Sequence, residues 1–166
     1  IEATEIEFPH LLARRNELKE DSGGPGHFRG GLGIQRELEI LEDNVLYTGL
    51  GDRHKIHPWG LKGGKEGAGG GFYRVAADGA VTHLSNKVTS LPMMEHDIVR
   101  VITPGAGGYG DPLNRDIQKV LQDVIECKVS VEGARRDYGV VIIGNEYDGY
   151  QIDEGATEAM RQELRR

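Results

Sequence analysis

Residues 21–33 read Asp-Ser-Gly-Gly-Pro-Gly-His-Phe-Arg-Gly-Gly-Leu-Gly, six glycines interspersed with an acid, a hydroxyl, an imidazole and a guanidinium. Two more glycine clusters follow at residues 60–71 and 105–110, so that 17 of the 25 glycines lie in three short segments. Glycine allows a positive φ and a close approach of backbone to a ligand or to another backbone. The clusters therefore indicate either turns and bulges of a crowded fold or loops that line a ligand, and the sequence leaves both open.

The first half of residues 21–33 copies the Asp-Ser-Gly-Gly-Pro string around the nucleophile of trypsin-like serine proteases. In that family the triad follows the order His, Asp, Ser, and the serine comes late in a double β-barrel. Only His10 precedes Ser22 here, and the preceding residues are too few to form such a barrel. Ser22 is therefore interpreted as a turn residue.

Neither of the other clusters predicts a nucleotide site of a common kind. Gly63-Gly64-Lys65-Glu66 lacks the spacing of a P-loop and the Ser or Thr that follows its lysine. Residues 105–110 resemble a dinucleotide fingerprint only loosely, because Asp111-Pro112 follows them in place of a βαβ unit.

The length of 166 residues and the composition predict a single domain, or a fragment of a larger protein, since the chain begins at Ile1 in place of methionine. A net charge of −7 argues against a nucleic-acid partner, which would need a basic face. No apolar stretch is long enough to cross a membrane. The single cysteine, Cys127, cannot form an internal disulfide, which favours a cytoplasmic location.

Alternating hydrophobicity predicts that residues 1–103 form a twisted antiparallel β-sheet. Residues 34–40 alternate Ile34, Arg36, Leu38 and Ile40 with two glutamates and a glutamine, so one face is expected to be buried and the other wet. Residues 45–50 are the expected partner of this strand across Glu42-Asp43-Asn44. Residues 72–75 and 80–84 are expected to form a hairpin around Asp78-Gly79. Another strand is expected at residues 98–102. The start of the chain also has an extended pattern, in Ile1, Ala3, Ile6 and Phe8.

The hydrophobic period becomes helical after the third glycine cluster. Short helices are expected at about 117–126, 131–138 and 154–164, capped by Asp116, Ser130 and Asp153, with a short strand at 140–143 between the last two. The fold class is therefore α+β, with its helices at the C-terminal end.

Residues 51–60 gather an acid, several bases and a tryptophan between two glycines. His54, His57 and Asp52 are conceivable metal ligands, but a loop does not enforce their geometry and no second cluster completes the set, so no metal site is predicted. An Asp52–Arg53 or Arg29–Asp21 pair that braces the loops is one interpretation. Direct contact of these arginines with a carboxylate or phosphoryl group is the other.

With these segments in view, the chain resembles the C-terminal part of the hydantoinase B family, which includes N-methylhydantoinase B, the corresponding half of 5-oxoprolinase and subunits of acetone and acetophenone carboxylases. The resemblance covers nearly the whole chain, in separate motifs that keep their order. They are residues 2–9, 21–26, 28–33, 51–53, 58–61, 63–64, 103–112, 123–124, 129–130, 134–141 and 152–157.

The resemblance implies a hetero-oligomeric, ATP-dependent enzyme that acts on a cyclic amide (a hydantoin, oxoproline or lactam), or a ketone carboxylase. Its expected partners are a hydantoinase A-type, actin-like ATPase subunit and the N-terminal part of the B-type subunit. ATP and a divalent metal are expected in the assembly, with neither held mainly by this chain, because the family's metal ligands lie in its N-terminal part. The chain is then either a fragment of the B-type protein or the small subunit of a split one, and by itself it is expected to be inactive.

Two hypotheses for the chain's own role remain. In the first it contributes loops to a composite active site, and the residues expected to contact substrate or phosphate are Asp21, Arg29, Asp52, Arg53 and His57, supported by the loop glycines Gly23, Gly24, Gly63, Gly64, Gly107 and Gly108. In the second it is a noncatalytic scaffold whose helix faces around Leu121 and Met160 meet other chains. No catalytic residue is assigned in either case.

Overall fold

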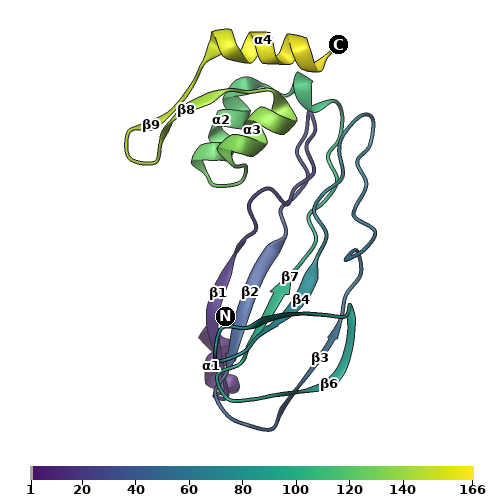
Figure 1. Ribbon diagram of the computed structural model, residues 1–166, viewed down its shortest axis with the longest axis vertical. Helices are drawn as coiled ribbons and strands as arrows, with labels where there is room; N and C mark the ends of the chain where they lie inside the picture. Colours follow the sequence, from purple (N-terminus) through teal and green to yellow (C-terminus); the bar gives the residue numbers. More distant parts are fainter. Residues whose placement is uncertain (1) are drawn as a thin grey trace. The chain divides into compact units, whose positions relative to one another are not determined.

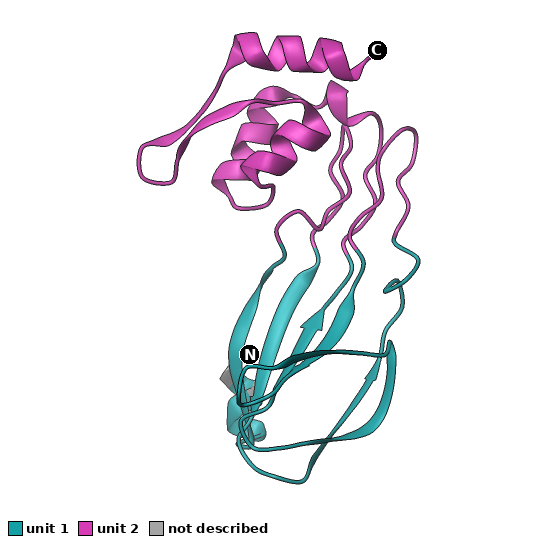
Figure 2. Ribbon diagram, viewed as in Figure 1, with its two compact units in different colours: residues 1–19, 33–57, 69–104 teal, residues 20–32, 58–68, 105–166 magenta. Residues whose placement is uncertain are grey.

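The computed structural model describes residues 2–166. The strands β1 to β7 lie before residue 103, and the helices α2, α3 and α4 follow it (Figure 1). The described residues form two compact units, each assembled from three separate segments (Figure 2). Unit 1 comprises residues 1–19, 33–57 and 69–104, and unit 2 comprises residues 20–32, 58–68 and 105–166. The predicted α+β class is confirmed.

Unit 1 is built on an antiparallel sheet of five strands in the order β1-β2-β7-β4-β5. The strands are β1 (Leu11–Leu18), β2 (Ile34–Ile40), β7 (Ile98–Ile102), β4 (Gly71–Val75) and β5 (Val81–Leu84). The predicted hairpin across Asp78-Gly79 is confirmed as β4–β5, and Gly79 takes the positive φ of 87° that this turn requires. The predicted strand 98–102 is β7, which lies between β2 and β4.

The expected pairing of residues 45–50 with residues 34–40 is wrong. Strand β3 (Val45–Leu50) pairs with β6 (Lys87–Met93) in a separate two-stranded sheet, because β1 and β7 already occupy both edges of β2. This arrangement buries an apolar cluster of Ile40, Met93 and Val99, with Leu11, Val45, Tyr47, Leu91 and Val101 packed around it.

The extended start that the sequence predicted is also wrong for the described residues, since Glu2–Glu7 form a short helix, α1. Ile1, which was part of that pattern, lies outside the described residues. The carboxylate of Glu5 accepts a hydrogen bond of 2.8 Å from the backbone N–H of Ala13, where the register of β1 shifts against β2. This local contact favours the helix over an additional strand.

The alternation along β2 is confirmed, but the face expected to be wet is buried. Glu37 and Glu39 are each less than a tenth exposed, because cations cover them. Arg100 donates to Glu37 at 2.6 Å, while Arg14 and His96 hydrogen-bond to Glu39. The hydrogen bond from Arg14, followed by that from His96, holds the pKa of Glu39 below its usual value.

All three predicted helices are confirmed in unit 2 as α2 (Ile117–Ile125), α3 (Val131–Tyr138) and α4 (Glu154–Leu164). Local signals start and stop them: the side chains of Asp116, Ser130 and Asp153 cap their first turns, and Gly139, with a φ of 62°, ends α3. The apolar faces of α2 and α3, with a short hairpin, bury Val120, Val124, Val129, Ala134, Tyr138, Val140 and Ile142.

The expected strand at 140–143 lies two residues further along, as β8 (Ile142–Asn145). It pairs with β9 (Gly149–Ile152), which the sequence analysis missed. The turn between them is held by the Asn145 side chain, which accepts hydrogen bonds from the backbone N–H groups of Tyr147 and Asp148. The 3-10 turn η1 (Pro112–Asn114) precedes α2.

Three glycine-rich segments of unit 2 lie against one another, backbone to backbone, outside the regular strands (Figure 2). They are residues 22–31, 58–68 and 105–110. Hydrogen bonds between them include Lys65 N to Pro25 O at 2.7 Å, Gly24 N to Ala106 O at 2.8 Å and Gly108 N to Lys65 O at 2.9 Å. Parts of all three glycine clusters therefore converge.

A side chain has no room where these segments touch. A Cβ on Gly108 would lie 2.1 Å from the carbonyl oxygen of Pro25, and one on Gly64 would lie 2.1 Å from the carbonyl oxygen of Gly108. Gly23, Gly24 and Gly107 face backbone oxygens at 2.3, 2.5 and 1.9 Å in the same way, whereas Gly63 sits in a turn with a φ of 91°. Close approach of backbone to backbone thus accounts for these glycines.

A buried carboxylate fastens one glycine-rich segment to helix α2. Asp123, whose side chain is 7% exposed, accepts hydrogen bonds from Arg29 at 3.2 and 3.3 Å and from Arg115 at 2.8 Å. Arg29 also donates to the carbonyl of Gly30, and Arg115 to that of His27. We call this arrangement the Asp123 clamp.

Replacing Gly108 with alanine is expected to lower the free energy of unfolding by ~3 kcal/mol or more, because the new methyl group would overlap the carbonyl of Pro25. Gly31→Ala is the matched control. No atom lies within 4 Å of a Cβ at Gly31, so its effect should stay within ~1 kcal/mol. Urea denaturation of both variants measures the difference, and equal stabilities would contradict the packing described.

Asp123→Asn should destabilise the protein by ~3–5 kcal/mol, since two largely buried guanidinium groups lose their counter-charge. Glu17→Gln removes an exposed partner of Arg15 and should cost less than ~1 kcal/mol. Thermal and chemical denaturation compare the two variants. A tolerated Asp123→Asn change would show that the clamp is dispensable.

Candidate functional site

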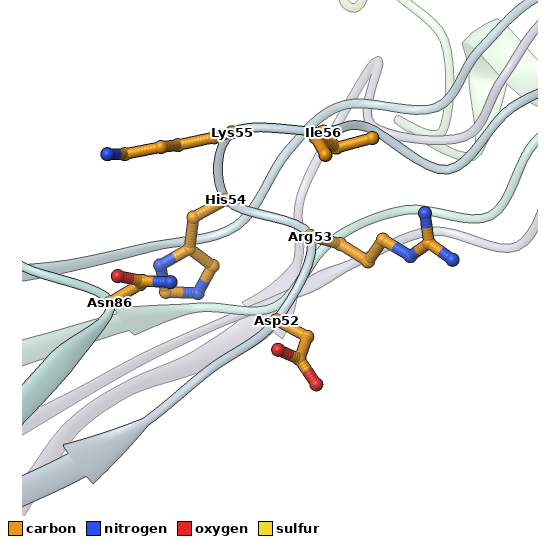
Figure 3. A pocket seen from close by; sticks show the side chains of 6 residues that line it. All are labelled: Asp52, Arg53, His54, Lys55, Ile56 and Asn86. Atoms are coloured by element: carbon orange, nitrogen blue, oxygen red, sulfur yellow. The ribbon is translucent and has the colours of Figure 1, made fainter.

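A pocket of about 450 Å³ opens in unit 1 beside the loop that follows β3. Figure 3 shows the side chains around it, and they come from two segments of the chain. The lining residues are Asp52, Arg53, His54, Lys55, Ile56 and Asn86. Five of them are consecutive, so one loop supplies most of the chemistry.

Backbone contacts fix the course of this loop. The N–H of Gly51 donates to the carbonyl of Asn86 at 2.9 Å, and the N–H of Gly70 donates to the carbonyl of Arg53 at 3.2 Å. Arg53 has a φ of 60°, which turns the chain sharply. A Cβ on Gly51 would lie 2.5 Å from Nε2 of His54, so this glycine makes room for the imidazole ring.

His54 is the group most affected by its surroundings. Its ring meets Phe72 edge-on, with ring centroids 4.8 Å apart, and its Nδ1 is buried without a hydrogen-bond partner among the described residues. Burial lowers the pKa of His54, the nearby His83 lowers it further, and Asp52 opposes both effects. His54 is therefore a neutral imidazole at pH 7, able to donate or accept a proton in hydrogen bonds.

The rest of the loop is charged and exposed. Figure 3 shows the Asp52 carboxylate and the Arg53 guanidinium extending in different directions from adjacent positions, with the Asn86 amide beside the His54 ring. Arg53 and Lys55 carry two positive charges within three residues. Figure 3 shows the Arg53 and Lys55 side chains extending in opposite directions, so each cation by itself is suited to an anionic group such as a carboxylate or phosphoryl group.

Two of the five residues predicted to contact substrate or phosphate, Asp52 and Arg53, come together in this pocket. His57 comes directly after the pocket residues in the chain but does not line the pocket. Its ring lies against Gly69, so close that a Cβ on this glycine would be 2.8 Å from it. Asp21 and Arg29 belong to unit 2.

Asp21 and Arg29, which one interpretation of the sequence paired with each other, both brace loops in unit 2, but each has a different partner. Asp21 accepts hydrogen bonds from the backbone N–H of Ser130 at 2.9 Å and from its hydroxyl at 2.6 Å, at the start of α3. Arg29 belongs to the Asp123 clamp.

Sequence reasoning considered His54 only as a metal ligand and missed Asn86. The glycines and bases of residues 51–60 were the signal for the loop, but nothing near residue 86 marks it as part of a site. No group of three or more His, Cys, Asp or Glu among the described residues is arranged to hold a metal ion. In residues 2–166 as the structure describes them, no helix is both long and apolar enough to cross a bilayer.

Comparison with known proteins connects this fold to a family. Residues 1–112 match the family model described as hydantoinase B/oxoprolinase. The chain is 45% identical over 161 residues to an uncharacterised protein of Methanocaldococcus jannaschii, covering 97% of this chain and 28% of that protein. It is 41% identical over 165 residues to the caprolactamase subunit beta of Pseudomonas jessenii, covering 97% of this chain and 27% of that subunit.

A solved structure shares the fold. The nucleotide-free structure of acetone carboxylase, from work on ATP-dependent acetone carboxylation, superposes with a TM-score of 0.81 at 26% identity, covering 94% of this chain and 25% of that one. The matching region is thus a mixed α+β part of much longer enzyme subunits. The chain belongs to the hydantoinase B/oxoprolinase family. It spans about a quarter of the length of the relatives that it matches.

An NMR titration of His54 should give a pKa below its ordinary 6.5, and Asp52→Asn should lower it further by removing the opposing charge. The unfolded chain then binds a proton at His54 more readily than the folded chain does. The free energy of unfolding should therefore decrease as the pH falls below about 6.5, and His54 should not change it above that pH. A midpoint at or above 6.5 would contradict the burial described.

Proposed function

We propose that this chain is part of a B-type subunit in a hetero-oligomeric, ATP-dependent enzyme that hydrolyses a cyclic amide such as a lactam, hydantoin or oxoproline. The observation that carries the proposal is the 41% identity to caprolactamase subunit beta across 97% of the chain. The family description, hydantoinase B/oxoprolinase, names two further reactions at cyclic amides.

The loop pocket supports a contribution of this chain to the composite active site. Activation of an amide by ATP creates a phosphorylated, negatively charged species, and fixed cations stabilise such charge best when they are placed beforehand. Arg53 and Lys55 supply cations at the pocket. The neutral His54 and Asn86 supply hydrogen bonds to the amide edge of the substrate.

The division of labour with other chains follows from what the described residues offer. They do not fit a divalent metal, because the pocket has one carboxylate and one imidazole where three or four ligands are needed. We therefore assign the metal to the N-terminal part of the B-type subunit, and, on the family resemblance, ATP to a hydantoinase A-type, actin-like partner. Asp21, Arg29 and the packed glycines hold the fold of unit 2 in this proposal.

Ketone carboxylation is the second candidate. The TM-score of 0.81 with acetone carboxylase over 94% of the chain favours it, and the pocket's cations suit the carboxylate of a carboxylated product equally well. A noncatalytic scaffold role remains the alternative for the chain's own contribution. Substrate assays of the assembly decide between amide and ketone, and variants of the pocket decide between contact and scaffold.

The test uses the complete B-type protein that carries this sequence, purified with its A-type partner and assayed with lactams, hydantoins, oxoproline, and acetone plus bicarbonate. Arg53→Ala is expected to lower kcat/KM by ~10–100-fold, the loss of one charged hydrogen bond to the anion, while the complex stays assembled by size-exclusion chromatography. Lys119→Ala, at an exposed position on α2, is the control and should retain normal turnover.

Normal turnover in both Arg53→Ala and Lys55→Ala would reject the contact role and favour the scaffold. Amide hydrolysis without carboxylation supports the first proposal, and carboxylation without hydrolysis supports the second.

A further inference from the structure

A row of large apolar side chains crosses the glycine-rich segments of unit 2. Phe28, Tyr109 and Leu61 come from the three different segments and are 59%, 49% and 56% exposed. Bridges between Phe28 and Tyr109 and between Leu61 and Tyr109 make them neighbours. We call these three residues the exposed row.

Backbone hydrogen bonds fix the exposed row in place. Phe28 and Tyr109 exchange N–H to O bonds of 2.9 Å in both directions. Leu61 donates to Gly108 at 2.9 Å and accepts from Gly110 at 2.9 Å, so it is held on the opposite edge of the same segment. The Phe28 and Tyr109 rings lie 6.3 Å apart at a tilt of 50°.

The exposed row is thus an apolar surface held by backbone hydrogen bonds, with the His27 ring edge-on to that of Phe28 at 4.6 Å. Its neighbours Gly26, Gly107 and Gly108 have no side chains to shield it. Soluble proteins scatter single apolar side chains over their surface, whereas a contiguous apolar patch marks a binding surface. A patch whose backbone is already ordered loses little conformational entropy when it is covered, which favours a permanent contact.

We propose that the exposed row is covered by an apolar segment of the same B-type polypeptide, from the part that lies outside these 166 residues. The proposal rests on the proposed function in one respect, that this chain is a piece of a B-type subunit. The relatives carry about three quarters of their length beyond the matched region, and that remainder is tethered to it covalently. Because it is tethered, such a segment has a higher effective concentration at the row than a separate subunit would have.

The chemistry of the row favours a permanent contact over an exchangeable one. Permanent interfaces resemble a domain core and are apolar at their centre, while exchangeable ones are more polar. Phe28, Tyr109 and Leu61 contribute one hydroxyl and no charge. The segment that covers them is therefore expected to be apolar, with a hydrogen-bonding group opposite the Tyr109 hydroxyl.

The test places a photo-crosslinker in the row of the complete B-type protein, purified in its assembly with the A-type partner. Phe28→p-benzoylphenylalanine replaces one aromatic side chain with another. After irradiation, mass spectrometry should find crosslinks to residues of the same polypeptide beyond this sequence, in several-fold higher yield than from Val81→p-benzoylphenylalanine, which is 56% exposed on β5. Leu61→p-benzoylphenylalanine repeats the measurement if the first variant folds poorly.

A mixture of ¹⁵N-labelled and unlabelled protein separates contacts within one chain from contacts between copies. Crosslinks of mixed isotope composition would assign the row to a second copy, and crosslinks to the A-type chain would assign it to that partner. Either result, or a yield no higher than at Val81, overturns the proposal. Turnover of the Arg53 variant is measured separately, so that failure of the proposed function is recognised independently of the crosslinking result.

Discussion

Three segments of backbone meet in unit 2 at distances where a single added methyl group would collide with a carbonyl oxygen. Gly64, Gly107 and Gly108 each face such an oxygen at 1.9–2.1 Å from the position that a Cβ would take. Because the segments bond to one another through N–H and C=O groups, the backbone satisfies its own polar atoms without forming regular strands. The Asp123 clamp and the exposed row are both attached to these segments, the clamp through Arg29 and the row through its own backbone.

Charged side chains occur in two different settings, buried in ion pairs and exposed at a pocket. In unit 2, Asp123 is enclosed by two arginines. In unit 1, the buried Glu37 and Glu39 are covered by side chains from neighbouring strands and from the turn before β7. Buried charges of this kind must be paired, because each would otherwise lose its hydration without compensation. Arg53 and Lys55 are exposed at a pocket, on a loop whose course backbone hydrogen bonds fix. The pocket is exposed whereas the clamp is largely buried, so the pocket is the candidate for contact with a ligand.

Membership of the hydantoinase B/oxoprolinase family gives this contrast a functional setting. The chain corresponds to about a quarter of its relatives, so a complete active site is expected only in a larger assembly. A loop with fixed cations, a neutral histidine and an amide is a suitable contribution to a composite site. An exposed apolar row on rigid backbone is a suitable point of attachment for the rest of a subunit.

Sequence alone determined the features that depend on neighbouring residues. Helices α2, α3 and α4 follow from their caps and periodicity, and the β4–β5 hairpin follows from Asp78-Gly79, because helix ends and tight turns are decided within a few residues. Tertiary structure decided which strands pair, that Glu37 and Glu39 are buried, that Arg29 bonds to Asp123, and that Asn86 joins the loop of residues 52–56. These contacts join residues far apart in the chain, and their partners are chosen by competition for strand edges and counter-charges, which no local pattern records. The glycine clusters lie between the two cases. Their composition indicated close approach, and only the fold showed that backbone is what approaches most of these glycines.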